Sequence, residues 1–120
     1  MMHMPHGWVV LKFTNEDNAF FKIFASWRGG YLDGDSWRLS SGSYERPRLS
    51  DCCKYWIWHQ TSGSCYKLAI HGENQYSSFS EIALCEILNA SNEKNIIKRL
   101  SMTELLDSFS NSIKTERDVN

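Results

Sequence analysis

The segment Ala25–Gly42 constrains the fold of this chain more than any other part of the sequence. It places four glycines, an Asp-Gly-Asp step and two Trp-Arg pairs close together. Glycine and Asp-Gly steps allow positive φ angles and sharp reversals of the backbone. Tryptophan and other bulky residues fit a half-buried strand surface. The segment therefore predicts the end of a β-sheet, with a tight turn and large side chains on it.

Alternation of apolar and polar residues predicts a hairpin before this segment. Gly7–Phe13 and Ala19–Trp27 are strand-like, and the polar cluster 14–18 between them is typical of a turn. Successive side chains of a strand point to opposite faces. The better core face of the second strand is expected to carry Ala19, Phe21, Ile23, Ala25 and Trp27.

Three shorter strands are expected further along, at Ser36–Ser40, Cys53–His59 and Cys65–Ile70. Residues 41–51 are expected to form a loop and Thr61–Ser64 a hairpin turn. Large rings alternate onto both faces of the second of these strands, so both faces are expected to be at least partly covered. The apolar face of the third strand is formed by Tyr66, Leu68 and Ile70.

The hydrophobic period changes after residue 77. Ser78–Glu81 has the sequence of a capping box, and apolar residues at helical spacing predict a helix over 79–91. The β-branched segment Asn95–Leu100 is interpreted as a short strand. A second capping box at Ser101–Glu104 precedes another amphipathic helix. The final residues, 114–120, are expected to form a frayed tail.

These elements predict an α+β fold with a mainly antiparallel sheet of about five strands packed with one or two C-terminal helices. A chain of 120 residues fits a single domain spanning 1–120. Within it, the sheet region is expected at about 7–70, the helical region at about 78–114 and the tail at 114–120.

Composition excludes several classes of protein. The formal net charge is −1, whereas proteins that bind duplex nucleic acid usually carry a basic excess. The sequence shows no signal-peptide pattern and no apolar run of the roughly 18 residues that a membrane helix needs. The cysteine spacing matches neither a zinc site nor a disulfide framework. We therefore expect free thiols in a reducing cytoplasm.

No arrangement of residues predicts catalysis. Asp33-Gly34-Asp35 supplies too few oxygen ligands for a cation and is better explained as a turn. Cys52 and Cys53 lie too far along an extended strand from His59 to form a nucleophile–base pair. We expect no catalytic residue, no metal and no cofactor, and hence a protein that is not an enzyme. A small hydrolase whose site assembles from distant residues is the remaining alternative.

The best candidate for function is an aromatic and arginine-rich set around the Asp-Gly-Asp turn. Trp, Tyr and Arg dominate binding hot spots because they combine large contact area with polar tips. The alternative is that the tryptophans belong to the core and the arginines only cover it. The predicted binding residues are Trp27, Arg28, Tyr31, Asp33, Asp35, Trp37 and Arg38.

The run Gly29–Gly42, a strand ending in Trp58-His59, and the later Ser62-Gly-Ser-Cys-Tyr-Lys67 resemble small proteins of tailed bacteriophages. The resemblance covers about residues 20–90, and these proteins have no assigned catalytic residues to carry over. It implies a viral protein that works in the cytoplasm of the infected bacterial host.

Two functions follow as hypotheses. The first is a non-enzymatic binding protein that inhibits or redirects a host protein, with an anti-phage defence effector as the expected partner. The second is a binder of nucleotides or single-stranded nucleic acid, because exposed aromatic rings on a sheet can stack on bases. The missing basic excess argues against the second.

Overall fold

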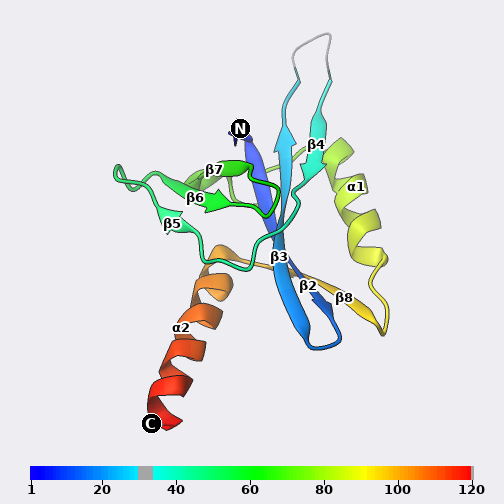
Figure 1. The fold of residues 1–120 in the computed structure, drawn as a ribbon. Helices are drawn as coiled ribbons and strands as arrows, with labels where there is room; N and C mark the ends of the chain where they lie inside the picture. Colours follow the sequence, from blue (N-terminus) through cyan, green and yellow to red (C-terminus); the bar gives the residue numbers. More distant parts are fainter. Residues whose placement is uncertain (30–33, 120) are drawn as a thin grey trace.

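The computed structural model describes the backbone of residues 1–29 and 34–119, and the side chains of the described residues up to 110. Two four-stranded sheets and two α-helices form the predicted α+β fold (Figure 1). The strands that the sequence assigns to one sheet are thus divided between two. Within the described part of the chain, no helix is long and apolar enough to cross a membrane.

The long sheet has the strand order β4-β3-β2-β8, and every neighbouring pair in it is antiparallel. The predicted hairpin is its centre, with Gly7 opposite Ser26 at one end and Asn15 opposite Asn18 at the other. Glu16, with φ of 54°, lies in the tight connection. The strands are β2 (Gly7–Asn15), β3 (Asn18–Trp27), β4 (Ser36–Leu39) and β8 (Asn95–Leu100).

The short sheet has the order β1-β7-β6-β5. Its central pair is the predicted hairpin around Thr61–Ser64, where Gly63 has a φ of 92°. The pairing of β1 with β7 is parallel and joins segments more than sixty positions apart. The strands are β1 (Met2–His3), β5 (Arg48–Leu49), β6 (Tyr55–His59) and β7 (Cys65–Ala69), followed by the 3₁₀ turn η1 (Ile70–Gly72).

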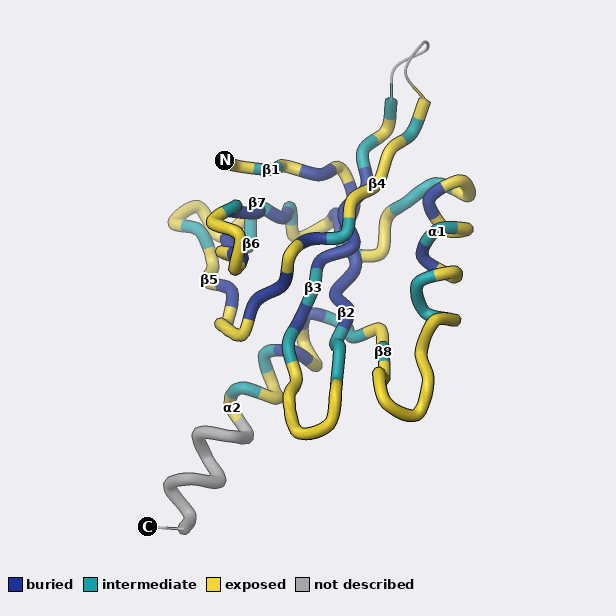
Figure 2. Tube along the Cα trace, turned by 45° about the vertical axis from the view of Figure 1, so that its right-hand side comes forward, coloured by how far each residue is buried: buried dark blue, intermediate teal, exposed yellow. Residues whose placement is uncertain are grey.

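The middle of β2 and β3, dark blue in Figure 2, is buried on both faces of the long sheet and lies at the centre of the molecule. On one face, Trp8, Val10 and Ile23 pack with side chains of the short sheet and of the first turns of α2 (Met102–Val119). On the other face, Val9, Leu11 and Phe24 pack with α1 (Ser78–Asn89). The predicted core face of β3 is buried at Phe21, Ile23 and Ala25, whereas Ala19 is exposed and Trp27 is half-buried. On the opposite face, Phe24 belongs to a second core.

A tryptophan hydrogen bond joins the two sheets. Trp8 is 1% exposed, and its indole Nε1 donates to the Ala69 carbonyl oxygen over 2.7 Å. Gly7 allows the backbone at Gln75 to approach the start of β2 closely, because a Cβ at Gly7 would lie 1.6 Å from the Gln75 carbonyl oxygen. On the short sheet, the buried Trp58 indole likewise donates to the Glu45 carbonyl over 2.8 Å. Because each buried indole N–H has an acceptor, neither carries the free-energy penalty of an unsatisfied buried donor.

Five local predictions need correction. The predicted loop 41–51 contains the two-residue strand β5, because Arg48 and Leu49 pair with Ile57 and Trp56. Cys53 has a φ of 62°, which a strand does not allow, so β6 begins at Tyr55. Ile70 leaves β7 for the 3₁₀ turn and is exposed, whereas Tyr66 and Leu68 are buried as expected.

The fourth correction concerns the start of α1. Ser77 is its N-cap, since the Ser77 hydroxyl accepts the Ser80 N–H over 3.3 Å, one residue before the predicted capping box. The second capping box is confirmed: the Glu104 N–H donates to Ser101 Oγ and the Ser101 N–H donates to Glu104 Oε1. The helix that follows, α2, continues to Val119, past position 114 where the tail is expected.

Candidate binding site

The register of β3 and β4 decides where the predicted binding residues lie. Ser26 is opposite Trp37. Ala25 is opposite Arg38. Opposite residues of an antiparallel pair share a face, and neighbours along a strand alternate. Trp27 and Arg38 therefore lie on the face toward the short sheet, while Trp37 lies on the face toward α1. The predicted set is divided across β4, an edge strand.

Trp37 is the most exposed of the described site aromatics. Its side chain is 41% exposed and stacks on the buried ring of Phe24, with centroids 5.5 Å apart and 19° between the planes. Phe24 is itself held in the second core beside Leu84. A large ring that is exposed on one side and fixed on the other can bind without losing much side-chain entropy.

Trp27 is half-buried and anchored to the N-terminal segment. Its indole Nε1 donates to the Met4 carbonyl oxygen over 3.1 Å. The His3 ring contacts it edge-on at 6.4 Å between centroids, and the same ring lies 4.7 Å from Tyr66. Trp27 also packs against the core on the face toward the short sheet, so it is partly a core residue, as the alternative interpretation expects, and partly accessible.

Arg38 is exposed beside this aromatic group. Burial and, next, the positive charge of Arg38 lower the pKa of His3 below its usual 6.5. Burial raises the pKa of Tyr66, and Arg38 partly opposes this shift. A shallow cavity of about 330 Å³ lies here, lined by Met1, His3, Trp27, Ser36, Trp37 and Arg38.

Arg28 and Asp35 are directed elsewhere. The Arg28 backbone N–H donates to His6 Nδ1 over 2.7 Å, and its side chain lines a different cavity. Asp35 Oδ1 accepts the Gly29 N–H over 3.2 Å. The Ser77 hydroxyl and then this N–H lower the pKa of the Asp35 carboxyl. The hydrogen bond from Gly29 to Asp35 thus stabilises the base of the β3–β4 hairpin. The predicted site residues Tyr31 and Asp33 lie outside the described residues.

The contribution of the N-terminal segment to this site was not predicted from the sequence. His3 and Met1 join the site because β1 pairs with β7, and His6 reaches β3 through its N–H, which donates to the Ser26 carbonyl over 3.0 Å. Two residues of parallel pairing leave no alternation to detect. The segment carried no hydrophobic period that could have revealed these contacts.

The residues considered for chemistry remain apart. Cys52 and Cys53 are exposed in the turn before β6, and His59 is exposed at the far end of that strand. The Ser50 hydroxyl, 3.4 Å from Cys52 Sγ, lowers the pKa of the Cys52 thiol. Among the residues that the structure describes, no three His, Cys, Asp or Glu side chains gather as a metal site would require.

Comparison with known proteins identifies no relative: no family model matches the chain, and no curated protein or solved structure matches it.

Proposed function

We propose that this chain is a non-enzymatic, phage-encoded protein that binds a host protein in the cytoplasm of the infected bacterium. The proposed partner is an effector of anti-phage defence, which the chain inhibits or redirects. The proposed binding surface consists of Trp27, Trp37, Arg38 and His3, and we call it the β4 ridge.

The observation that carries this proposal is the exposed Trp37 ring braced on Phe24. Arg38 is exposed at the next position of the same strand and points to the opposite face. Because β4 is an edge strand, a partner that closes around it contacts Trp37 on one side and Arg38 on the other. Trp and Arg are the residue types that most often dominate the free energy of association.

A second feature supports binding at this place. The described backbone of β4 pairs with β3 along one side, and its other side is the edge of the sheet. An edge strand offers N–H and C=O groups to a partner strand. Side chains of hot-spot type on both faces of such an edge would set the register of the added strand.

Affinity capture from a host lysate tests the proposal. The Trp37→Ala/Arg38→Ala variant is expected to lose the partner that the unaltered protein retains, since both exposed anchors are removed. Tyr44→Ala/Arg46→Ala is the matched control, because it removes an exposed aromatic ring and an exposed arginine from another surface. Capture of the same partner by both variants would reject the β4 ridge as the binding surface.

The alternative, a binder of nucleotides or single-stranded nucleic acid through sheet aromatics, has less support at this surface. On the neighbouring sheet Trp58 is 1% exposed and offers no face for stacking on a base, while Trp56 is half-buried. A salt-sensitive shift with an oligonucleotide that Trp37→Ala abolishes would favour it.

A further inference from the structure

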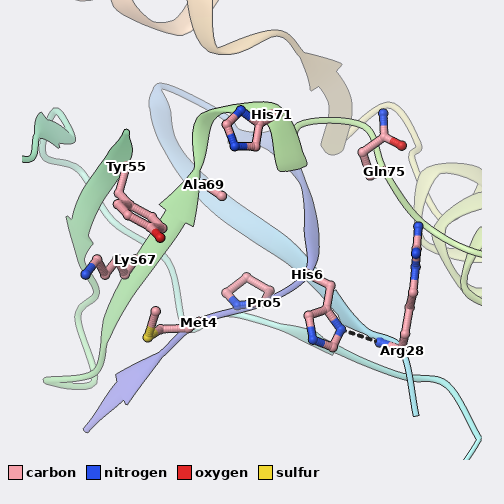
Figure 3. Close-up of a pocket in the computed structure, with 9 residues that line it drawn as sticks. All are labelled: Met4, Pro5, His6, Arg28, Tyr55, Lys67, Ala69, His71 and Gln75. Carbon is pink, nitrogen blue, oxygen red and sulfur yellow. Dashed lines mark hydrogen bonds between the residues drawn. The ribbon is translucent and has the colours of Figure 1, made fainter. Parts of the chain in front are cut away.

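A cavity of about 630 Å³ opens between β7 and the segment that follows β1 (Figure 3). Its origin is topological. β1 pairs with β7 only at Met2 and His3, after which the chain leaves β7 and reaches β3 through the His6 N–H. The edge of β7 beyond Tyr66 is therefore left beside a hollow. Sites for small organic ligands typically have volumes of about 300–1,000 Å³.

The polar lining of this cavity is cationic. Arg28 and Lys67 are permanent cations, His6 and His71 add two imidazoles, and Gln75 adds an amide. None of its described lining residues is Asp or Glu, although the whole chain has a net charge of −1. The nearby Asp35 accepts from the Gly29 N–H and lines an adjoining crevice, which His6 and Arg28 also line. A hollow lined by one sign of charge concentrates ligands of the opposite sign.

One end of the cavity is organised by His6. Its Nδ1 accepts the Arg28 backbone N–H over 2.7 Å, so the neutral ring carries its proton on Nε2. This nitrogen is then a donor, and the same hydrogen bond fixes the backbone from which the Arg28 guanidinium extends. Figure 3 shows Arg28 and Gln75 at this end of the hollow. Guanidinium groups bind phosphate oxygens in a fork of two hydrogen bonds.

The other end holds Lys67 and Tyr55. The Lys67 ammonium lies 4.4 Å from the centroid of the Tyr55 ring. This contact holds the cation in place, and it also occupies one face of the ring. His71 projects from the 3₁₀ turn between the two ends (Figure 3). Positive groups at both ends suit an extended polyanion better than a single small anion.

We propose that this cavity binds a polyphosphate group through the Arg28 guanidinium and the His6 Nε2–H, with Lys67 adding positive charge at the other end of the cavity. The ligand can be a nucleoside polyphosphate or an inorganic polyphosphate, because recognition is by the phosphates. Each removed charge-assisted hydrogen bond is expected to weaken binding about tenfold or more.

Titration calorimetry at low salt separates these ligands. ATP and inorganic tripolyphosphate are expected to bind with a stoichiometry of one, whereas adenosine is expected not to bind. Equal affinity for ATP and tripolyphosphate identifies the phosphates as sufficient, and tighter binding of ATP identifies a nucleotide. No binding of either, comparable binding of adenosine, or affinity for oligonucleotides that rises with their length would overturn the proposal.

Variants locate the site. Lys67→Gln/His71→Gln removes a lysine and a histidine of the cavity lining that lie outside the β4 ridge, and it is expected to weaken tripolyphosphate binding about tenfold or more. Lys98→Gln/His59→Gln is the matched control, since both residues are exposed on other surfaces. An equal loss in both variants would contradict the site.

Two further readouts keep the test decisive. In the unaltered protein, tripolyphosphate is expected to shift the ring resonances of His6 and His71 but not those of His59, and the reverse pattern would contradict the site. The Trp37→Ala/Arg38→Ala variant is expected to retain tripolyphosphate binding. Failure of the cavity and failure of the β4 ridge are therefore distinguishable.

Discussion

The exposed indole of Trp37 rests on the buried ring of Phe24, with 5.5 Å between centroids and 19° between planes. The contact links the proposed binding surface to the core between the long sheet and α1. A residue without solvent exposure thus fixes the orientation of one that a partner would touch. Stacked aromatic pairs contribute about 0.5–1.5 kcal/mol beyond the area they bury.

Phe24→Leu is therefore expected to affect both stability and binding. It should lower the free energy of unfolding by about 1–2 kcal/mol, because the smaller side chain packs imperfectly in a fully buried position. It should also weaken capture of the partner, since Trp37 loses its support. Urea denaturation and quantitative pull-down measure the two effects.

Phe13→Leu is the control for this variant. Phe13 stacks on Phe20 at 5.6 Å and packs against the same core, but away from Trp37. It is expected to lower stability without weakening partner binding. Equal loss of binding in both variants would show that stability, and not the support of Trp37, controls the interaction.

The start of α2 provides a second prediction. Ser101→Ala removes the hydroxyl that accepts the Glu104 N–H over 3.1 Å and should lower the free energy of unfolding by about 1 kcal/mol. Ser110→Ala, which changes an exposed serine inside the helix, should have almost no effect. Equal destabilisation by both variants in chemical denaturation would contradict the assignment of the cap.

The pH dependence of this cap follows from Glu104. Hydrogen bonds from Ser101 hold the pKa of the Glu104 carboxyl below its usual 4.5. The unfolded chain therefore binds this proton more readily, and the contribution is present above pH 4.5 and lost as the pH falls through the lowered value. Glu104→Gln should flatten that part of the stability profile, measured by thermal unfolding across pH 3–6.

The strands of the long sheet could be predicted because their information is local. Alternation along β2 and β3 and the polar turn between them fix a hairpin. The division into two sheets could not be predicted in the same way. It depends on Trp8, whose indole reaches the Ala69 carbonyl across 61 positions, and on β1, whose two residues pair in parallel with β7. Neither contact leaves a periodic signal.

The predicted binding residues do not form one surface in the structure. Trp37 and Arg38 are exposed as a binding surface requires. Arg28 instead turns toward the cationic cavity, because its backbone N–H is held by His6. The cavity residues Lys67 and His71 lie four positions apart, in β7 and the 3₁₀ turn after it, and they meet His6 and Arg28 only through the sheet topology. Their juxtaposition therefore could not be read from the sequence.

Trp8→Phe tests the connection between the sheets. The variant keeps an aromatic ring but loses the 2.7 Å hydrogen bond to Ala69, and it should lower the free energy of unfolding by about 1–3 kcal/mol. Hydrogen exchange is expected to show faster exchange in β7 than in β3, because the long sheet keeps its own pairing. Trp58→Phe is the comparison, since its lost bond to Glu45 lies elsewhere on the short sheet. Uniform acceleration in all strands after Trp8→Phe would contradict this account.

The charge of Arg38 is expected to contribute, after burial, to the lowered pKa of His3. Burial and the Arg38 charge lower the pKa of His3 below 6.5, so between the two values the unfolded chain binds the proton more readily than the folded one. Stability should therefore fall as the pH decreases through 6.5, and the penalty should be absent at higher pH. Arg38→Gln should raise the His3 pKa, measured from its ring resonances by NMR, while Arg99→Gln should leave it unchanged because Arg99 contacts Tyr76 and Asn74 instead. A His3 pKa that does not respond to Arg38→Gln would place the guanidinium away from the aromatic group and remove it from the β4 ridge.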